Sequence, residues 1–364
     1  MAEFFADYGL FLLKVLTFVV AIIVVVMVVG MAAARGRKAQ AEGHIEIRKL
    51  NESMDELRES LKHTLMNPAL LKQSLKEKKA AEKAKSKEEK KAAKEAAKQR
   101  GKGQTVVEEP RSKAVYVVNF DGDIRASAVS SLRKEVTAIL TAANIEDEVV
   151  LKLESGGGMV TGYGLAASQL DRLRHKEIPL TICIDKVAAS GGYMMACVAD
   201  KILAAPFAVV GSIGVVAQLP NFHRLLKEHN IDVELLTAGK YKRTLTMFGE
   251  NTDEGRDKFI EDIEQIHTQF KDYVQERRPD LNIEEVATGE IWSGEAAKAK
   301  KLIDEIKTSD EYLLEACERA DVFEVKYKQK KPIMEKFGMA AQSTIDGVLF
   351  RWFDRLMRSR FSIG

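Results

Sequence analysis

Between residues 114 and 277, short apolar runs alternate with longer segments of helical periodicity. The apolar runs predict strands at 114–120, 148–153, 178–184, 201–204 and 231–236. The other segments predict helices at 127–143, 160–175, 190–199, 221–229 and 252–277. Such alternation is typical of βαβ units, so the sequence predicts an α/β fold with a mostly parallel sheet flanked by helices.

Glycine-rich turns follow three of these strands. Gly156-Gly157-Gly158 comes after the second strand, Ser190-Gly191-Gly192 after the third and Gly211-Ser212-Ile213-Gly214 after the fourth. Ligands in parallel sheets bind at the carboxyl ends of the strands, where we expect the first two turns to lie. The first turn lacks the glycine spacing of a dinucleotide site and the Gly-Lys-Ser/Thr ending of a P-loop. It fits either a phosphate-binding nest or an oxyanion hole of backbone N–H groups, and the residues do not decide between them.

Ser190 is expected at a turn between a buried strand and a helix. Free backbone N–H groups and the helix dipole favour a developing negative charge there, which suits a nucleophile. The alternative is an ordinary serine N-cap, with Gly191 and Gly192 present for tight helix packing. This stretch alone favours the alternative.

A serine nucleophile needs a general base. None of the six histidines falls in a glycine-bearing turn, so a Ser-His-Asp arrangement has no natural candidate. Lys240 and Lys242 follow the run 231–236, which predicts that they lie near the same sheet edge. A lysine acts as a base only when desolvation or nearby cations lower its pKa from about 10.4 toward neutrality. The alternative, two surface lysines in a basic loop, is favoured by these residues alone.

The N-terminal region predicts a membrane anchor. The 20 residues from Val15 to Ala34 carry no charge and are long enough to span a hydrocarbon core, so we expect bilayer contact over residues 9–34. A signal peptide is disfavoured because the run is long and basic residues follow it rather than precede it. Those residues, at positions 35, 37 and 38, predict a cytoplasmic location for the rest of the chain, although a periplasmic one stays open.

The remaining segments divide the chain further. Residues 39–67 place apolar side chains at spacings of three and four, which predicts a helix, as in a short coiled coil or a seam with a neighbouring chain. The Lys/Glu/Ala-rich tract 72–102 predicts a solvated helical or disordered spacer. We therefore expect an anchor (1–38), a linker (39–112), a globular domain (113–329) and an amphipathic helical tail (330–364) that packs between subunits or lies on a membrane.

Overall charge and cysteine content do not indicate nucleic-acid binding, a disulfide framework or a zinc site. The chain has 56 Lys and Arg against 54 Asp and Glu, and this net charge of +2 does not indicate nucleic-acid binding. Two of its three cysteines lie inside apolar runs without metal-ligand spacing, so neither a disulfide framework nor a zinc site is indicated.

Five segments together resemble the SppA/SohB-type inner-membrane serine peptidases of bacteria. They are Glu154–Gly164, Asp185–Tyr193, Gly211–Val215, Gly239–Lys242 and Gly289–Ala297, the last leading into Leu302-Ile303-Asp304. With the anchor they cover most of the chain in order, and the combination is specific although each segment alone is not. The resemblance implies a ClpP/crotonase-like fold, a ring-shaped homo-oligomer in the bacterial inner membrane, and no metal or cofactor.

The resemblance also implies a Ser/Lys dyad. Ser190 takes the position of the nucleophile and Lys242 that of the general base, while the Ser212 hydroxyl would orient the lysine. The backbone N–H groups of Gly157 and Gly191 would form the oxyanion hole. In some members a neighbouring subunit donates the lysine. The implied substrates are signal-peptide remnants and other membrane-derived or unfolded peptides.

Two positions depart from the family pattern. Gly156 stands where relatives often have proline, which adds backbone freedom to the first glycine turn. Lys301 stands where glycine is usual, so it is either strained in a left-handed conformation or the helix ends differently. The alternatives for function are a non-catalytic membrane scaffold and a crotonase-like acyl-thioester enzyme on the same fold. A Ser/Lys pair would argue against both.

Overall fold

The computed structural model describes residues 43–65 and 112–329, together with residues 13, 14, 17, 18 and 87. Most of the predicted membrane span, the spacer 72–102 apart from Lys87, and the tail 330–364 lie outside the described residues. Within the described part, no helix is both long and apolar enough to cross a bilayer. The chain divides into a unit of residues Ile45–Lys326 and a second unit that joins Met1–His44 to Tyr327–Gly364.

The described strands form a ten-stranded sheet. They are β1 (His44–Lys49), β2 (Ala114–Gly122), β3 (Glu148–Ser155), β4 (Leu180–Ile184), β5 (Val187–Ala189), β6 (Lys201–Ala204), β7 (Val209–Gly211), β8 (Ile291–Ser293), β9 (Glu305–Ile306) and β10 (Asp321–Lys328). The main path runs β1-β10-β2-β3-β4-β6-β9, and from β10 to β9 every pair is parallel. The end of β3 also pairs with β5, which continues through β7 to the antiparallel β8. The sheet therefore forks at β3.

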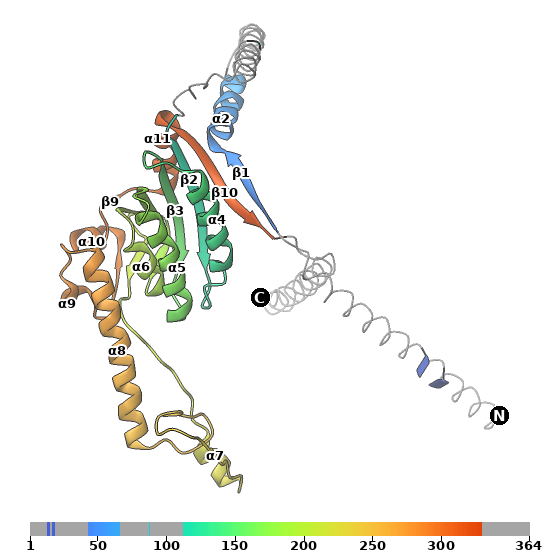
Figure 1. Ribbon diagram of the computed structural model, residues 1–364, viewed down its shortest axis with the longest axis vertical. Helices are drawn as coiled ribbons and strands as arrows, with labels where there is room; N and C mark the ends of the chain where they lie inside the picture. Colours follow the sequence, from blue (N-terminus) through green and yellow to red (C-terminus); the bar gives the residue numbers. More distant parts are fainter. Residues whose placement is uncertain (1–12, 15–16, 19–42, 66–86, 88–111, 330–364) are drawn as a thin grey trace, which may run out of the picture. The chain divides into compact units, whose positions relative to one another are not determined.

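Helices cover both faces of this sheet (Figure 1). The described helices are α2 (Leu50–Leu65), α4 (Val129–Ala142), α5 (Val160–Arg174), α6 (Gly191–Ala196), α7 (His223–Glu228), α8 (Asp253–Arg277), α9 (Ile283–Val286), α10 (Gly294–Ala299) and α11 (Ser309–Arg319). Alternate residues of β2 pack into different clusters: Tyr116 and Val118 join the core under α4 and α5, whereas Val115 and Val117 join residues of α11. This period of two is what a strand buried on both faces requires.

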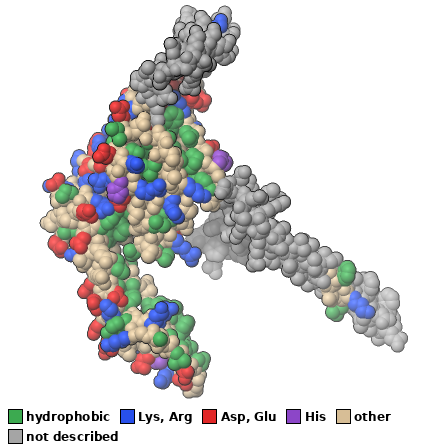
Figure 2. Space-filling view, in the orientation of Figure 1, with side chains coloured by type: hydrophobic (Ala, Val, Ile, Leu, Met, Phe, Trp, Pro, Cys, Tyr) green, Lys and Arg blue, Asp and Glu red, His purple; other side chains and the backbone are tan. Residues whose placement is uncertain are grey.

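The α/β fold is confirmed, but two local predictions are wrong. The pattern over residues 39–67 is not helical throughout, because β1 occupies His44–Lys49 and joins the sheet before α2 begins. The run 231–236 is not a strand: it has no regular structure, and Leu236 is 89% exposed. It lies in the segment 216–251, where Figure 2 shows apolar side chains exposed among charged ones.

The last turns of α8 are fixed to the rest of the unit by two charged pairs. Arg277 donates from Nη2 to both carboxylate oxygens of Asp171 on α5, at 3.1 Å each. Arg278 makes two hydrogen bonds to Asp304, at 2.7 and 3.1 Å, just before β9. Charge-assisted, two-point contacts of this kind restrain orientation as well as position. The C-terminal half of α8 is thus held against the core.

Lys301 ends α10 in the left-handed conformation, with φ of +62°. Its N–H donates to Lys298 O at 3.0 Å, and Leu302 N–H donates to Ala297 O at 2.9 Å. These two bonds form a Schellman motif, in which the left-handed position normally holds glycine. Of the two alternatives for Lys301, the structure therefore has the left-handed conformation.

Candidate active site

The fork at β3 brings the three glycine-bearing turns together. Ser155 at the end of β3 is in register with Ala188 of β5, and Ala189 is in register with Gly211 of β7. These strands are parallel, so the residues that follow them emerge at one edge. The prediction that the first two turns share an edge is confirmed, and Ser212, from the third turn, lies beside them.

Ser190 lies in a strained backbone conformation between β5 and α6. Its φ and ψ are +52° and −118°, and its N–H donates to Gly211 O at 2.8 Å. An ordinary N-cap has extended φ and ψ and accepts a hydrogen bond on its side chain, whereas the Ser190 side chain makes no such bond. Ser190 therefore occupies the N-cap position of α6 without the conformation or the side-chain bond of an ordinary cap. Strain in a non-glycine residue is retained mainly where function demands it.

Ser212 shares this feature, with φ of +53°. Its N–H donates to Glu290 O at 2.6 Å, and the antiparallel pairing of β7 with β8 supports the turn. Both serines are partly exposed to the same cavity.

Gly157 lies in van der Waals contact with Ser190. Its φ is +88°, and a Cβ atom added there would lie 2.7 Å from Ser190 Cβ and from Ala189 O. No other residue type fits this position without displacing the backbone beside Ser190. The Gly157 N–H donates to Ser155 Oγ at 3.0 Å, whereas the N–H of Gly158 has no acceptor among the described residues.

Gly191 and Gly192 have a packing role, as the alternative reading of this stretch proposed. A Cβ atom on Gly191 would lie 2.4 Å from Cγ of Tyr163, and one on Gly192 would lie 2.6 Å from Ser155 O. The first turn of α6 is therefore pressed against α5 and the end of β3. The N–H of Gly191 has no acceptor among the described residues, as expected in the first turn of a helix.

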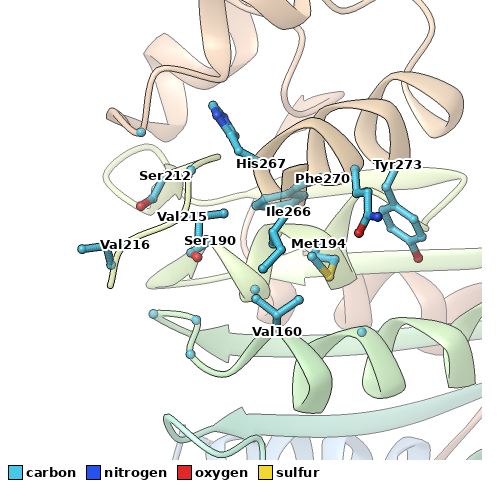
Figure 3. A pocket seen from close by; sticks show the side chains of 18 of the residues that line it. Val160, Ser190, Met194, Ser212, Val215, Val216, Ile266, His267, Phe270 and Tyr273 are labelled. Carbon is cyan, nitrogen blue, oxygen red and sulfur yellow. The ribbon is translucent and has the colours of Figure 1, made fainter. Parts of the chain in front are cut away.

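A cavity of about 830 Å³ opens beside these turns. Ser190 and Ser212 lie at one end, and Figure 3 shows Val160 of α5 and Met194 of α6 directed toward Ile266 and Phe270 of α8. Its size falls within the range of small-molecule and peptide side-chain pockets. The arrangement suits an apolar side chain placed next to the Ser190 hydroxyl.

Lys242 does not lie beside Ser190 in this chain. No lysine is among the described residues that line the cavity. The preceding residue, Tyr241, donates to Glu254 at 3.4 Å near the start of α8, whereas the cavity is lined from Ile266 onward. Twelve residues of α-helix span about 18 Å. The predicted placement of Lys242 at the sheet edge is wrong within one chain, because it depended on a strand at 231–236.

Lys240 pairs with Glu254, with 2.5 Å between Nζ and Oε1. Hydrogen bonding to this carboxylate raises the pKa of Lys240. A general base needs the opposite shift, so Lys240 is unsuited to that role.

His267 lines the cavity although no sequence pattern singled it out. Its Nε2 is buried and has no hydrogen-bond partner among the described residues, and Figure 3 shows the ring directed away from Ser190. His267 lies on a helix and not in a glycine-bearing turn, so the sequence did not indicate it as a candidate base. The signal that would have found it is its place next to Ile266 and Phe270, which line the same cavity. No cluster of His, Cys, Asp and Glu in the described part has metal-binding geometry.

Comparisons with known proteins identify the family of this chain. Residues 3–170 match the N-terminal region of peptidase family S49, and residues 172–323 match peptidase family S49 itself. The chain is 46% identical over 357 residues to "Probable protease SohB" of Haemophilus influenzae, which covers 98% of each chain. It is 61% identical over 200 residues, 55% of this chain and 66% of the relative, to "Probable protease SohB" of Buchnera aphidicola subsp. Schlechtendalia chinensis. Both parts of the family match in order, and one relative aligns along nearly the whole length, so the chain belongs to peptidase family S49.

Proposed function

We propose that this peptidase is a membrane-anchored serine endopeptidase in which Ser190 is the nucleophile and Lys242 of a neighbouring copy is the general base. The observation that carries the proposal is the strained Ser190, which faces an apolar cavity between two glycine turns. A hydroxyl exposed there has room for a peptide carbonyl, and the N–H groups nearby can receive negative charge. Membership of a peptidase family fits the same reading.

In the proposed reaction, a neutral Lys242 amine takes the proton from Ser190 Oγ as the oxygen attacks the peptide carbonyl carbon. The developing oxyanion is bound by backbone N–H groups of Gly191 and of the turn at Gly157. The tetrahedral intermediate collapses to an acyl-enzyme, and the ammonium group returns its proton to the leaving amine. Water activated by the same lysine then releases the acid. The Ser212 hydroxyl orients the lysine.

Supply of the lysine by a second copy fits two features of the chain. Lys242 is exposed, and its neighbour Tyr241 contacts Glu254, which lies about 18 Å along α8 from the first cavity-lining residue of that helix. It also belongs to the segment 216–251, which buries little in its own chain. Its exposed large apolar side chains are Val216, Leu219, Phe222, Leu225, Ile231, Val233, Leu235, Leu236, Tyr241, Met247 and Phe248. Surfaces of this kind mark interaction sites, and a head-to-tail contact between identical chains closes into a ring.

The apolar side chains of Val160, Met194, Ile266 and Phe270 in the cavity support apolar peptide substrates. Signal-peptide remnants and other membrane-derived or unfolded peptides have this character, and an anchor at residues 9–34 would hold the enzyme where they arise. Arg35, Arg37 and Lys38, which follow the anchor, support a cytoplasmic active site by the positive-inside rule. The forked parallel sheet, with its serine at the edge, supports assignment to the ClpP/crotonase-like class.

Complementation between inactive variants tests the proposal. Detergent-solubilised Ser190→Ala and Lys242→Ala proteins are each assayed for cleavage of a fluorogenic apolar peptide, then dissociated, mixed and reassembled. Each variant alone should be inactive, and an equal mixture should recover about a quarter of wild-type activity, because one site in four pairs an intact serine with an intact lysine. Full activity of Ser190→Ala refutes the nucleophile. No recovery on mixing refutes donation by a neighbour.

A further inference from the structure

The glycine turn beside Ser190 has an unusual need for restraint. Three consecutive glycines follow Ser155, and none brings the fixed φ of a proline. Glycine loses more conformational freedom on folding than any other residue. Contacts from outside the turn must therefore hold it against Ser190.

A chain of hydrogen bonds supplies such a contact. Gly157 N–H donates to Ser155 Oγ at 3.0 Å, Ser155 Oγ lies 2.5 Å from Tyr163 OH, and Tyr163 OH donates to Asp123 O at 2.8 Å. A carbonyl oxygen only accepts, so the tyrosine proton goes to Asp123 O. The tyrosine oxygen then accepts the serine proton, and the serine oxygen accepts from Gly157. Each hydroxyl donates once and accepts once, which fixes the chain in one direction.

Burial makes these hydrogen bonds hard to rearrange. Ser155 is 2% exposed and Tyr163 is fully buried. Water cannot replace a lost partner there, and an unpaired buried hydroxyl is costly. Burial also raises the pKa of Tyr163, so its hydroxyl keeps the proton that it donates. Gly122 O, at 3.3 Å from Ser155 Oγ, is the next nearest acceptor and is more distant.

The ring of Tyr163 acts on the other side of the site. It fills the space where a Gly191 Cβ would lie, 2.4 Å from Tyr163 Cγ, and so sets how closely α6 approaches α5. An edge contact with Phe120, at 6.4 Å between ring centroids, fixes the ring in turn. One side chain therefore touches both glycine elements that flank Ser190.

We propose that Ser155 and Tyr163 are positioning residues for the reaction at Ser190. Their hydroxyls anchor the Gly156–Gly158 turn through the amide of Gly157, and the Tyr163 ring sets the backbone of Gly191. Because the anchor consumes the Gly157 N–H, the free amide that this turn offers to an oxyanion is that of Gly158. This inference rests on the proposed serine mechanism and assigns how its oxyanion site is held.

The test uses the full-length, detergent-solubilised protein and four variants: Ser155→Ala, Tyr163→Phe, the double variant and Tyr193→Phe. Tyr163→Phe keeps the ring but breaks the hydrogen-bond chain. Tyr193→Phe is the matched control. Tyr193 is equally buried, in α6, but its hydroxyl donates to Leu302 O and takes no part in the hydrogen bonds that join Gly157, Ser155, Tyr163 and Asp123. For each protein, kcat and KM for a fluorogenic apolar peptide, inhibition by a peptide boronate of the same sequence, and Tm are measured.

Ser155→Ala should lower kcat about 10- to 100-fold, as expected for a misplaced oxyanion site, with KM changed less than about twofold. The boronate, which forms a tetrahedral adduct, should lose affinity in parallel with kcat. Tyr163→Phe should act in the same direction. The double variant should lose no more than Ser155→Ala, because the tyrosine acts through the serine. Tyr193→Phe should lower Tm and leave kcat unchanged.

Three results would overturn the inference: kcat retained in both single variants, additive losses in the double variant, or a rise in kcat for Ser155→Ala. A rise in kcat for Ser155→Ala would mean that Ser155 competes with the oxyanion for the Gly157 N–H and does not position the turn. Ser190→Ala distinguishes failure of this inference from failure of the proposed function. If Ser190→Ala is inactive while Ser155→Ala and Tyr163→Phe are fully active, only the positioning role fails. If Ser190→Ala is active, the serine mechanism itself fails.

Discussion

Substitution of Gly157 by alanine tests the geometry around Ser190 most directly. The residue has φ of +88°, and the added methyl would lie 2.7 Å from Ser190 Cβ and Ala189 O and 2.8 Å from Gly191 N. Two of these three atoms belong to backbone, which cannot swing aside as a flexible side chain can. Either the glycine turn or the segment around Ser190 must move.

The size of that movement follows from the distances. Ordinary contacts of a Cβ atom begin at 3.4 Å, so a displacement of about 0.7 Å is needed to restore one. Active-site groups must be held within about 0.5 Å of their working positions, and an error of about 1 Å costs roughly 100-fold in rate. We therefore expect kcat/KM to fall about 100- to 1,000-fold, the range seen when an oxyanion donor is lost. The positive φ adds about 1–3 kcal/mol of strain, which lowers Tm by several degrees.

Gly156→Ala is the matched control on the neighbouring residue. A Cβ atom there meets nothing within 4 Å, and its φ lies outside the left-handed region. Both variants are compared with wild type by peptide cleavage, by labelling with an acylating serine probe and by thermal unfolding. The reasoning is refuted if Gly157→Ala keeps activity within about threefold of wild type, or if the two alanines lose activity equally.

Three further predictions concern stability and are checked by thermal or urea unfolding. Lys301→Gly should raise the free energy of unfolding by about 0.5–1 kcal/mol, because glycine relieves left-handed strain at some entropic cost. Lys300→Gly is the control: Lys300 is right-handed, so glycine there should lower the free energy of unfolding. Asp185→Ala should cost about 2–3 kcal/mol, because the buried Ser309 loses partners at 2.8 Å for its N–H and 2.5 Å for its hydroxyl; Asp185→Asn, which keeps one acceptor, should cost less. Burial raises the pKa of Cys197 from 9.0 to about 12, so the free energy of unfolding should fall as pH rises above about 9. The fall should be less steep in Cys197→Ala, and an equal dependence on pH in the two proteins would contradict this.

The sheet was predictable because its strands are apolar runs bounded by turns. β2, β3, β4 and β6 lie within about two residues of their predicted positions. The short strands β5, β7 and β8, of three residues each, were not separately predicted. They are too short to show periodicity, and only the pairing of β5 with β3, of β7 with β5 and of β8 with β7 makes them strands. The sequence therefore did not predict the fork that assembles the site. It did single out the glycine-rich turns that follow the strands of the fork.

The error at 231–236 has a different cause. Alternating apolar residues there have the pattern of a half-buried strand, but no strand of the described part pairs with them. An alternating apolar pattern indicates a face that favours burial, but it does not indicate whether the same chain or another one buries that face. Lys242 was misplaced for the same reason. β1 illustrates the converse, since its side chains are mostly exposed and its place in the sheet depends on β10.

The two parts of the proposed site differ in how firmly their own chain holds them. Ser190 and its glycine turns rest on a buried fork, where the core, the Tyr163 hydrogen bonds and the clamped end of α8 restrain them. Lys242 rests on a segment whose apolar side chains find little cover in their own chain. A single chain can thus fold and hold its nucleophile without an adjacent base. Contacts that bury the segment 216–251 against a second copy would also deliver the lysine and desolvate it, and desolvation is what lowers a lysine pKa toward neutrality. On this account, assembly and activation of the base are one event.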